Sequence, residues 1–228
     1  MNISGIVKSS LIDYPGLISC VLFVPGCNYN CFYCHNRSLI DGTHILLTPN
    51  YVTDFLKRRS DLLDGVVVSG GEPTLQNDLV SFLLSLKLMG YKVKLDTNGS
   101  RPDIVKEILK LGICDYFAVD YKAPAEQYSA ICGRGADPVP VLETIGLLME
   151  GEIPFEVRTT VIPQLGTGEL IAMAKEIPKV PRYVLNRYKV PDKYLPRDEE
   201  RILARQHTSE EIQSLAGSVT VWQPNIVY

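Results

Sequence analysis

The sequence has no long run of charge of one sign and no run of apolar residues long enough to cross a membrane. Its formal net charge is −3, whereas a general nucleic-acid binder needs a basic face. A transmembrane helix needs about 20 apolar residues in succession. The first residues also lack the basic and apolar segments of a secretory signal. We therefore expect a cytoplasmic protein that binds neither nucleic acid nor membranes.

The sequence also lacks internal repeats, low-complexity segments and flexible linkers. A chain of 228 residues, 46% of them hydrophobic, is long enough to bury a sizeable core. We therefore predict one domain over residues 1–228. Within it, residues 189–228 match no pattern that we recognise and are interpreted as a C-terminal extension.

Cysteines are few, and half of the six lie in one short segment. An intracellular chain with this number of cysteines favours metal or redox chemistry over a disulfide framework. Cys20, Cys114 and Cys132 are scattered, and Cys20 lies in an apolar run typical of core packing.

The other three cysteines form the motif Cys-x-x-x-Cys-x-x-Cys at Cys27, Cys31 and Cys34. Soft thiolates suit both zinc and iron–sulfur clusters. A [4Fe–4S] cluster with three cysteine ligands keeps one iron open for a chelating molecule. His35 follows Cys34 directly, although zinc ligands are usually spaced by two or more residues. A disulfide is a further alternative, but three cysteines cannot all pair with one another.

Strand and helix patterns alternate along the chain, which predicts a parallel sheet with helical crossovers. The chain is shorter than the roughly 250 residues of a full eight-unit barrel. We therefore predict an α/β fold, a partial (open) parallel β/α barrel of about six strand–helix units, with a doubly wound sheet as the alternative. The predicted strands are Ile18–Val24, Gly65–Ser69, Tyr91–Asp96, Tyr116–Tyr121, Phe155–Ile162 and Tyr183–Tyr188. Helices are predicted at 48–59, 78–89, 102–111, 139–150, 168–176, 198–206 and 209–216, and a final strand at 219–223.

The unusual short motifs follow the predicted strands, and these strand ends share one face of a parallel barrel, where active sites lie. Taken singly, each motif has an ordinary structural interpretation. The glycines and Asn98 are good turn residues, Asp120 is a suitable helix cap, and lysines such as Lys122 are mostly exposed. Their shared placement favours a functional site. The motifs are the cysteine segment, Gly70-Gly71-Glu72-Pro73, Asp96-Thr97-Asn98-Gly99 and Asp120-Tyr121-Lys122.

Two of these motifs together carry a resemblance to a known family. Cys27, Cys31 and Cys34, with the aromatic Tyr33 before the last cysteine, are followed by Gly70-Gly71-Glu72-Pro73. In this pairing the chain resembles the radical S-adenosylmethionine (SAM) superfamily. Over most of its length it is similar to glycyl-radical-enzyme activating proteins, and especially to activating proteins of anaerobic ribonucleoside-triphosphate reductase. Further segments that carry this similarity are Ser10–Gly16, Gly26–Asn28, Cys34–Asn36, Asp96–Gly99 and Asp120–Lys122.

The resemblance implies that Cys27, Cys31 and Cys34 hold a [4Fe–4S] cluster whose open iron is chelated by SAM. It implies cleavage of SAM by the reduced cluster and hydrogen abstraction by the resulting 5′-deoxyadenosyl radical. The remaining pocket residues are then assigned as follows. Backbone at Gly70 and Gly71 approaches the methionine moiety, and Glu72 or neighbouring backbone oxygens accept hydrogen bonds from its ammonium group. Lys122 pairs with the methionine carboxylate, and Tyr33 lies near the adenine. Asp96, Thr97 and Asp120 shape the pocket around a monovalent cation.

The short chain has one cysteine motif and no added substrate domain. This favours a protein substrate, namely a glycyl-radical enzyme, with a flavodoxin or ferredoxin as external electron donor. One alternative is a small-molecule radical enzyme resembling 7-carboxy-7-deazaguanine synthases. The other is an iron–sulfur protein without catalytic activity.

Overall fold

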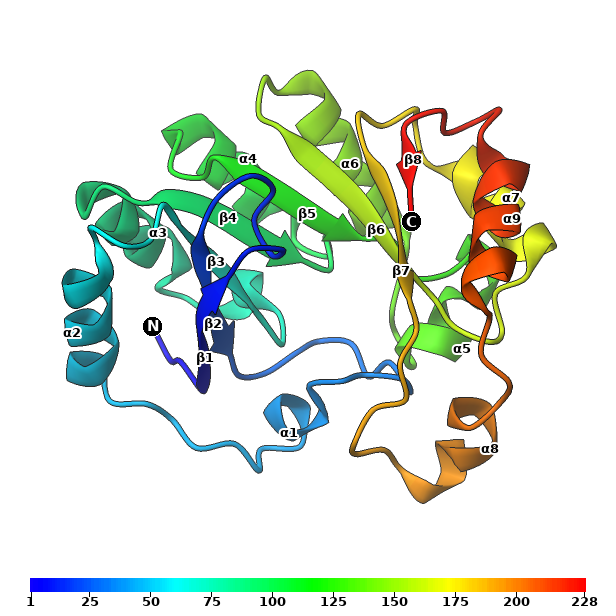
Figure 1. Ribbon diagram of the computed structural model, residues 1–228, viewed down its shortest axis with the longest axis horizontal. Helices are drawn as coiled ribbons and strands as arrows, with labels where there is room; N and C mark the ends of the chain where they lie inside the picture. The colour runs from blue at the N-terminus through cyan, green and yellow to red at the C-terminus, as the bar shows by residue number, and fades with distance from the viewer. The chain divides into compact units, whose positions relative to one another are not determined.

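The computed structural model describes all residues, Met1–Tyr228 (Figure 1). The chain divides into two compact units, which are described separately. The first unit comprises Met1–Asn28, Ser38–Thr97 and Asp103–Ala118. The second comprises Tyr29–Arg37, Asn98–Pro102 and Val119–Tyr228. The predicted organisation as one domain stays a prediction. No helix is long and apolar enough to span a membrane.

The strands are ordered as in the sequence, from β1 at one edge to β8 at the other, so the sheet is open. β1 pairs with β2 antiparallel, while the pairs β2–β3, β3–β4, β6–β7 and β7–β8 are parallel. The predicted α/β class with an open parallel sheet is confirmed. The strands are β1 Gly5–Ser10, β2 Ser19–Val24, β3 Gly65–Gly70, β4 Lys92–Thr97, β5 Tyr116–Asp120, β6 Phe155–Val161, β7 Tyr183–Arg187 and β8 Ile226–Val227.

The helices that follow the strands agree with the predicted positions to within a few residues. Thr48 caps the first long helix by accepting from the Tyr51 N–H at 3.3 Å, with Pro49 at the first helical position. The short helices α1 and α5 were not predicted. The helices are α1 Arg37–Ile40, α2 Pro49–Arg59, α3 Leu79–Leu88, α4 Pro102–Leu111, α5 Tyr128–Cys132, α6 Val139–Glu150, α7 Thr167–Glu176, α8 Glu199–Ile202 and α9 Ser209–Val219.

Two predictions near the C-terminus are wrong. Residues 219–223 do not form a strand, because α9 continues to Val219 and β8 begins only at Ile226. A capping box between Thr208 and Glu211 starts α9, and its buried residues recur at helical spacing. The helix predicted over 198–206 is confined to α8. With the antiparallel β1 and the short β8, the sheet has two strands beyond the six units predicted.

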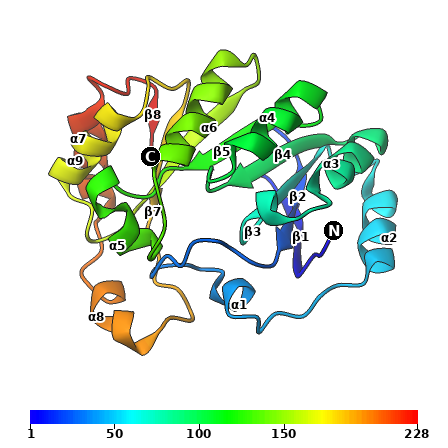
Figure 2. The same cartoon turned by 180° about the vertical axis from the view of Figure 1, so that it is seen from behind.

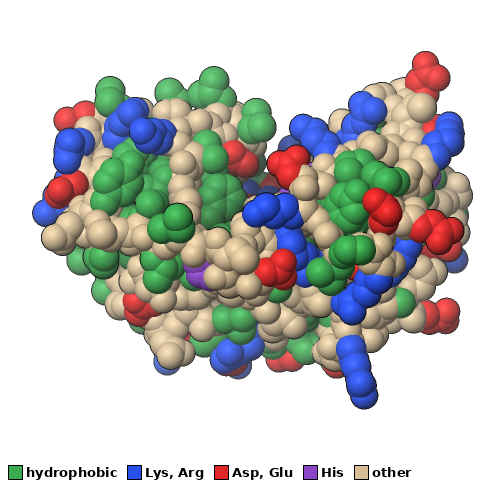
Figure 3. Space-filling model, turned by 90° about the horizontal axis from the view of Figure 1, so that it is seen from below, with side chains coloured by type: hydrophobic (Ala, Val, Ile, Leu, Met, Phe, Trp, Pro, Cys, Tyr) green, Lys and Arg blue, Asp and Glu red, His purple; other side chains and the backbone are tan.

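In the first unit, β2 and β3 are in register so that Val24 lies opposite Gly70, and their carboxyl ends are level. The central residues of β3 and β4, such as Val67 and Leu95, are fully buried. Hydrophobic side chains gather on the surface over α2 and the segment before it (Figure 3). Ile45 is the most exposed of them, at 83%.

In the second unit, β6 and β7 pair in parallel, and α7 lies beside α9 (Figure 2). Buried polar groups tie the strands together. The Thr159 hydroxyl on β6 donates to the Tyr121 carbonyl oxygen at 2.7 Å and lies 2.9 Å from the Tyr183 hydroxyl on β7. These bonds satisfy groups that are costly to bury alone, so they fix the residues that follow β5.

Candidate functional site

The glycine pair after β3 packs against the segment that leads from β2 into the cysteine motif. The Gly71 N–H donates to the Val24 carbonyl at 2.8 Å, and the Glu72 N–H donates to the Gly26 carbonyl at 2.7 Å. A Cβ atom on Gly71 would lie 1.8 Å from the Gly26 oxygen. Gly70 has φ +123°, and a Cβ there would lie 2.3 Å from the Val24 nitrogen. Both positions therefore require glycine for close backbone packing.

Glu72 is fully buried and lies between the ends of β3 and β4. Its Oε1 accepts hydrogen bonds from the Thr74 N–H at 3.1 Å, the Thr74 hydroxyl at 2.6 Å and the Thr97 hydroxyl at 2.7 Å. Two predicted site residues, Glu72 and Thr97, are thus in direct contact. These hydrogen bonds give the Glu72 carboxylate a structural function, whether or not it also contacts a ligand.

Asp96 on β4 forms a buried ion pair inside the same unit. The Lys94 Nζ donates to the Asp96 Oδ1 at 2.8 Å, and the Lys94 side chain is 1% exposed. The same ammonium group lies 5.8 Å from the centre of the Tyr116 ring. A lysine is rarely buried this completely without a partner, and the sequence interpretation did not include Lys94.

In the second unit, Cys31 and Cys34 lie in one tight turn, in which the Cys34 N–H donates to the Cys31 carbonyl at 3.2 Å. The buried Arg37 holds this turn: its guanidinium donates to the Cys31 carbonyl at 3.0 Å and also to the Asn30 side-chain oxygen. None of the cysteines forms a disulfide. The turn therefore presents two free thiols from a braced backbone.

The two thiols differ in their electrostatic surroundings. A hydrogen bond from the Cys132 thiol, aided by the charge of Lys122, lowers the pKa of Cys31 to about 7 against the opposing effect of burial. Burial is the main cause that raises the pKa of Cys34. Thiolates are the form that binds metal, so the surroundings of Cys31 favour ligation near neutral pH.

Asp120 and Lys122, the last predicted pair, interact directly after β5. The Lys122 Nζ donates to the Asp120 Oδ2 at 3.0 Å, and the Arg158 Nε on β6 donates to the Asp120 Oδ1 at 3.0 Å. Burial opposes ionisation of Asp120, but Arg158 and Lys122 together lower its pKa to about 2. Asp120 is therefore a charged partner of two basic side chains, and the helix-cap interpretation is not needed.

Lys122 and Tyr33 interact electrostatically in the second unit, because each of them shifts the pKa of the other. Burial acts to lower the pKa of Lys122, but Asp120 and then Tyr33 and Cys31 raise it well above its usual value. Burial raises the pKa of Tyr33. The Tyr33 ring also meets Tyr188 edge-on at 6.5 Å between ring centres. Lys122 thus keeps its charge next to the cysteine turn.

Sequence reasoning missed two residues beside the cysteine turn, Arg37 and Cys132. Cys132 appeared to be one of three scattered cysteines, and only the fold brings its thiol to Cys31. Cys20 is buried, as expected for a core residue, and Cys114 is buried as well. No spacing rule links Cys132 to the motif, because it belongs to α5, which was not predicted.

The donor set fits an iron–sulfur cluster in its chemistry. None of the three motif cysteines forms a disulfide, Cys27 in the first unit and Cys31 and Cys34 in the second. No group of three or more His, Cys, Asp or Glu side chains is placed to hold a single metal ion. A cluster does not need such a group, because each cysteine binds a different iron.

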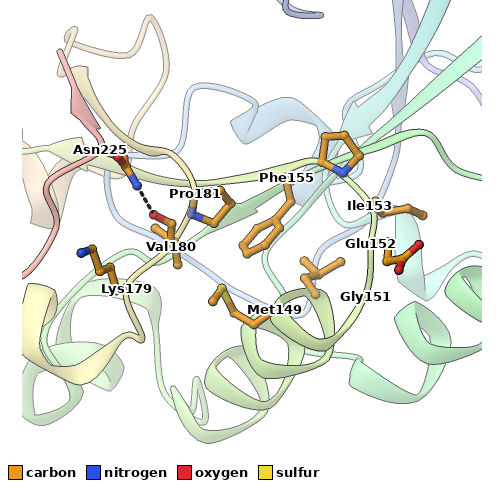
Figure 4. A pocket seen from close by; sticks show the side chains of 11 residues that line it. Met149, Gly151, Glu152, Ile153, Phe155, Lys179, Val180, Pro181 and Asn225 are labelled. Carbon is orange, nitrogen blue, oxygen red and sulfur yellow. Dashed lines mark hydrogen bonds between the residues drawn. The ribbon is translucent and has the colours of Figure 1, made fainter.

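A cavity within the second unit lies elsewhere. It has a volume of about 470 Å³ and lies where the chain enters β6 and β7, among Met149, Phe155 and Lys179 (Figure 4). At its wall the Asn225 amide donates to the Val180 carbonyl at 3.2 Å. It contains none of the predicted residues, which follow the opposite, carboxyl ends of their strands. We therefore do not assign it to the candidate site.

Comparison with known proteins defines the class of the chain. The family described as the Radical SAM superfamily matches residues 21–177. The chain belongs to the radical SAM superfamily and is a radical SAM enzyme, as the sequence motifs predicted. In fold it is similar to Streptococcus suis SuiB bound to S-adenosylmethionine, with a TM-score of 0.67 and 16% identity over 89% of this chain. The chain spans about half of SuiB, 48% of its length.

Two relatives by sequence differ in how much of the chain they match. The protein named "Putative glycyl-radical enzyme activating enzyme MJ1227", from Methanocaldococcus jannaschii, is 32% identical over 99% of this chain and 94% of its own length. The protein named "Probable GTP 3',8-cyclase", from Thermococcus kodakarensis, is 30% identical over 65% of this chain and 49% of its own length. The first similarity extends through both units, and the second covers only part of the chain.

Proposed function

We propose that this protein is an activating enzyme that generates a glycyl radical on a separate partner enzyme, an anaerobic ribonucleotide reductase. The observation that carries the proposal is the similarity to the M. jannaschii protein over 99% of this chain and 94% of that relative. An external one-electron donor, a flavodoxin or ferredoxin, completes the proposed system.

In the proposal, Cys27, Cys31 and Cys34 hold a [4Fe–4S] cluster that binds SAM. When bound, this group supplies the electron that breaks the sulfur–C5′ bond of SAM, which gives methionine and the 5′-deoxyadenosyl radical that takes a hydrogen atom from the partner's glycine. The Cys31–Cys34 turn, braced by Arg37, orients two of the thiolates. Orientation and exclusion of competing reactions are the contributions expected of the protein.

The charged residues suggest how the substrate is held. Lys122 is poised to pair with the SAM carboxylate, since its pKa is raised and its charge is retained. Tyr33 offers an aromatic ring for the adenine. Glu72 supports the backbone of Gly70 and Gly71 through its bonds to Thr97 and Thr74, and that backbone approaches the methionine moiety.

A monovalent cation at Asp96, Thr97 and Asp120 stays a prediction. Asp96 already accepts a hydrogen bond from Lys94, and Asp120 accepts one from Lys122. These ammonium groups supply the positive charge that a cation would provide. The proposed chemistry therefore does not depend on a bound cation.

The test is anaerobic reconstitution with iron and sulfide, followed by SAM, a reductant and the candidate partner. We expect release of 5′-deoxyadenosine and an electron paramagnetic resonance (EPR) doublet that changes when the partner's glycine carries deuterium. A protein that holds a cluster yet releases no 5′-deoxyadenosine would be an iron–sulfur protein without this activity. Release of 5′-deoxyadenosine with consumption of a small metabolite, and no partner radical, would identify a small-molecule enzyme instead.

A further inference from the structure

The short helix α8 contacts the cysteine turn through the side chain of Arg201. The guanidinium carbon of Arg201 lies 3.8 Å from the centre of the Phe32 ring, and Phe32 directly follows Cys31 in the turn. The same guanidinium donates to the Ala130 carbonyl on α5 at 3.2 Å. A planar guanidinium stacks well on an aromatic face, so Arg201 joins the cysteine turn to both α8 and α5.

Aromatic side chains lead from α8 to Tyr33, the residue proposed to lie near the adenine of SAM. The Phe32 ring meets the Tyr33 ring edge-on at 5.3 Å between ring centres. Tyr33 also meets Tyr188 edge-on at 6.5 Å, and the Tyr188 hydroxyl donates to the Ile202 carbonyl at 3.1 Å. Both ring neighbours of Tyr33 are thus held by consecutive residues of α8, Arg201 and Ile202.

The helix α8 is itself anchored within the second unit. The Gln164 side-chain amide donates to the Arg201 carbonyl at 2.9 Å, and the Ile202 side chain is fully buried. Phe32 and Tyr33 are buried as well, and closely packed interiors leave side chains little room to move. The C-terminal extension, which matches no sequence pattern that we recognise, therefore has a fixed contact with the cysteine motif.

We propose that Arg201 is a positioning residue: by stacking on Phe32 it fixes the Tyr33 ring in the orientation that receives the adenine of SAM. The inference rests on the proposed function, in which Tyr33 lies near the adenine, and it gives the C-terminal extension a role in binding the nucleoside. A ring that is already held loses little conformational freedom when the ligand binds, and this preorganisation strengthens binding.

Arg197 provides a matched control, since both arginines approach the same carboxylate. The Arg197 Nε lies 3.9 Å from the Asp198 Oδ2, and the Arg201 Nη1 lies 4.0 Å from the Asp198 Oδ1. Only Arg201 of the two stacks on Phe32. Any general effect of removing a positive charge beside Asp198 should therefore be seen in Arg197→Ala as well.

A pair of ligands separates the adenine side of the site from the methionine side. S-Methylmethionine carries the amino, carboxylate and sulfonium groups of SAM but has no adenosine. A defect in the turn or in the cluster lowers the affinity for both ligands, whereas a displaced Tyr33 ring lowers only the affinity for SAM. The ratio of the two dissociation constants is therefore a readout that a purely structural role of Arg201 would not change.

The experiment compares the native protein with Arg201→Ala, Arg201→Lys, Arg197→Ala, Phe32→Leu and the double variant Arg201→Ala/Phe32→Leu, all reconstituted anaerobically. Iron and sulfide content and the melting temperature are measured first. Anaerobic calorimetric titration then gives the Kd for each ligand with the cluster oxidised, so that SAM is not cleaved during the measurement.

We expect native iron content in Arg201→Ala, a rise of about threefold to tenfold in the Kd for SAM, and an unchanged Kd for S-methylmethionine. Arg201→Lys keeps the charge but not the planar face, so it should resemble Arg201→Ala, and Arg197→Ala should match the native protein. The double variant should bind SAM no more weakly than Phe32→Leu, because without the ring the arginine has nothing to position.

The outcomes separate this inference from the proposed function. Native affinity for SAM in a fully loaded Arg201→Ala protein, or an equal loss for both ligands, would overturn the positioning role and leave the proposed function standing. Additive losses in the double variant would overturn the route through Phe32. A native protein that holds no cluster would instead remove the proposed function. If Arg201→Ala loses iron, Arg201→Met keeps a long side chain without the guanidinium, and its ratio of dissociation constants decides.

Discussion

The Thr97 hydroxyl on β4 donates a 2.7 Å hydrogen bond to Glu72, which follows β3 and is fully buried. This bond joins the carboxyl ends of two neighbouring parallel strands. It also links the Gly-Gly-Glu-Pro motif to the motif that contains Thr97. Because a buried carboxylate is costly without partners, the two motifs depend on each other. The Gly-Gly-Glu-Pro segment is thereby held in place from β4 as well as from the cysteine motif.

Glu72→Ala should destabilise the protein. The Thr97 hydroxyl and the Thr74 N–H and hydroxyl lose their shared acceptor, and each buried group left unsatisfied costs on the order of 1–3 kcal/mol. Urea unfolding measures the change in the free energy of unfolding. Glu107→Ala, at an exposed position of α4, is the control and should change little. Equal stabilities of the two variants would contradict the structural role of Glu72.

Gly71→Ala should disrupt the packing between the glycine pair and the segment leading to Cys27. The added Cβ would lie 1.8 Å from the backbone oxygen of Gly26, so the backbone must shift. We expect lower stability and lower iron content after reconstitution. The matched control is Gly146→Ala within α6, where a Cβ meets nothing within 4 Å and alanine favours the helix by about 1 kcal/mol. Native iron content in Gly71→Ala would show that the segment tolerates displacement.

Lys122→Ala should weaken SAM binding more than it lowers iron content. Loss of a charge-assisted hydrogen bond costs roughly 1.5–3 kcal/mol, which corresponds to a tenfold or larger rise in Kd. Anaerobic titration of the loaded protein with SAM measures the affinity. Lys106→Ala, at an exposed position of α4, is the control. Unchanged affinity in Lys122→Ala would mean that Lys122 serves only as the partner of Asp120.

The Asp120 ion pairs should make stability depend on pH in the acid range. The pKa of Asp120 is lowered to about 2 by Arg158 and Lys122 acting against burial, while an unfolded Asp titrates at about 3.9. A depressed pKa contributes stability that is present above about pH 4 and lost as the pH falls toward 2. Asp120→Asn should lack this part of the acid sensitivity in urea unfolding measured across that range. Parallel pH profiles for both proteins would contradict it.

Cys31→Ala should prevent assembly of the cluster, since it removes one of three proposed ligands. Cys20→Ala should retain the cluster, because Cys20 is fully buried in β2 and burial raises its pKa to about 12. Iron and sulfide analysis after anaerobic reconstitution provides the measurement. Full iron and sulfide content in Cys31→Ala would overturn the ligand assignment.

Much of the class and fold was determined by local sequence. The three cysteines with Tyr33 and the Gly-Gly-Glu-Pro motif identified the superfamily, because their chemistry depends on residue type and short spacing. Alternating strands and helices predicted the open parallel sheet, since hydrophobic period and capping act over a few residues. The strand at 219–223 was predicted wrongly, because β-formers there coincide with the end of a helix whose buried face is set by packing.

Only the tertiary structure decided which side chains became partners. Glu72 meets Thr97, Arg158 meets Asp120, and the backbone of Cys132 meets Asn30 next to Cys31, all across long separations in sequence. No local rule contains these pairs, because they arise where the ends of different strands and helices converge. The sequence by itself determined which chemical groups are present and what they can bind. The fold decided which of these groups are paired with an opposite charge and which are held by hydrogen bonds, since burial and charge pairing are properties of the packed chain.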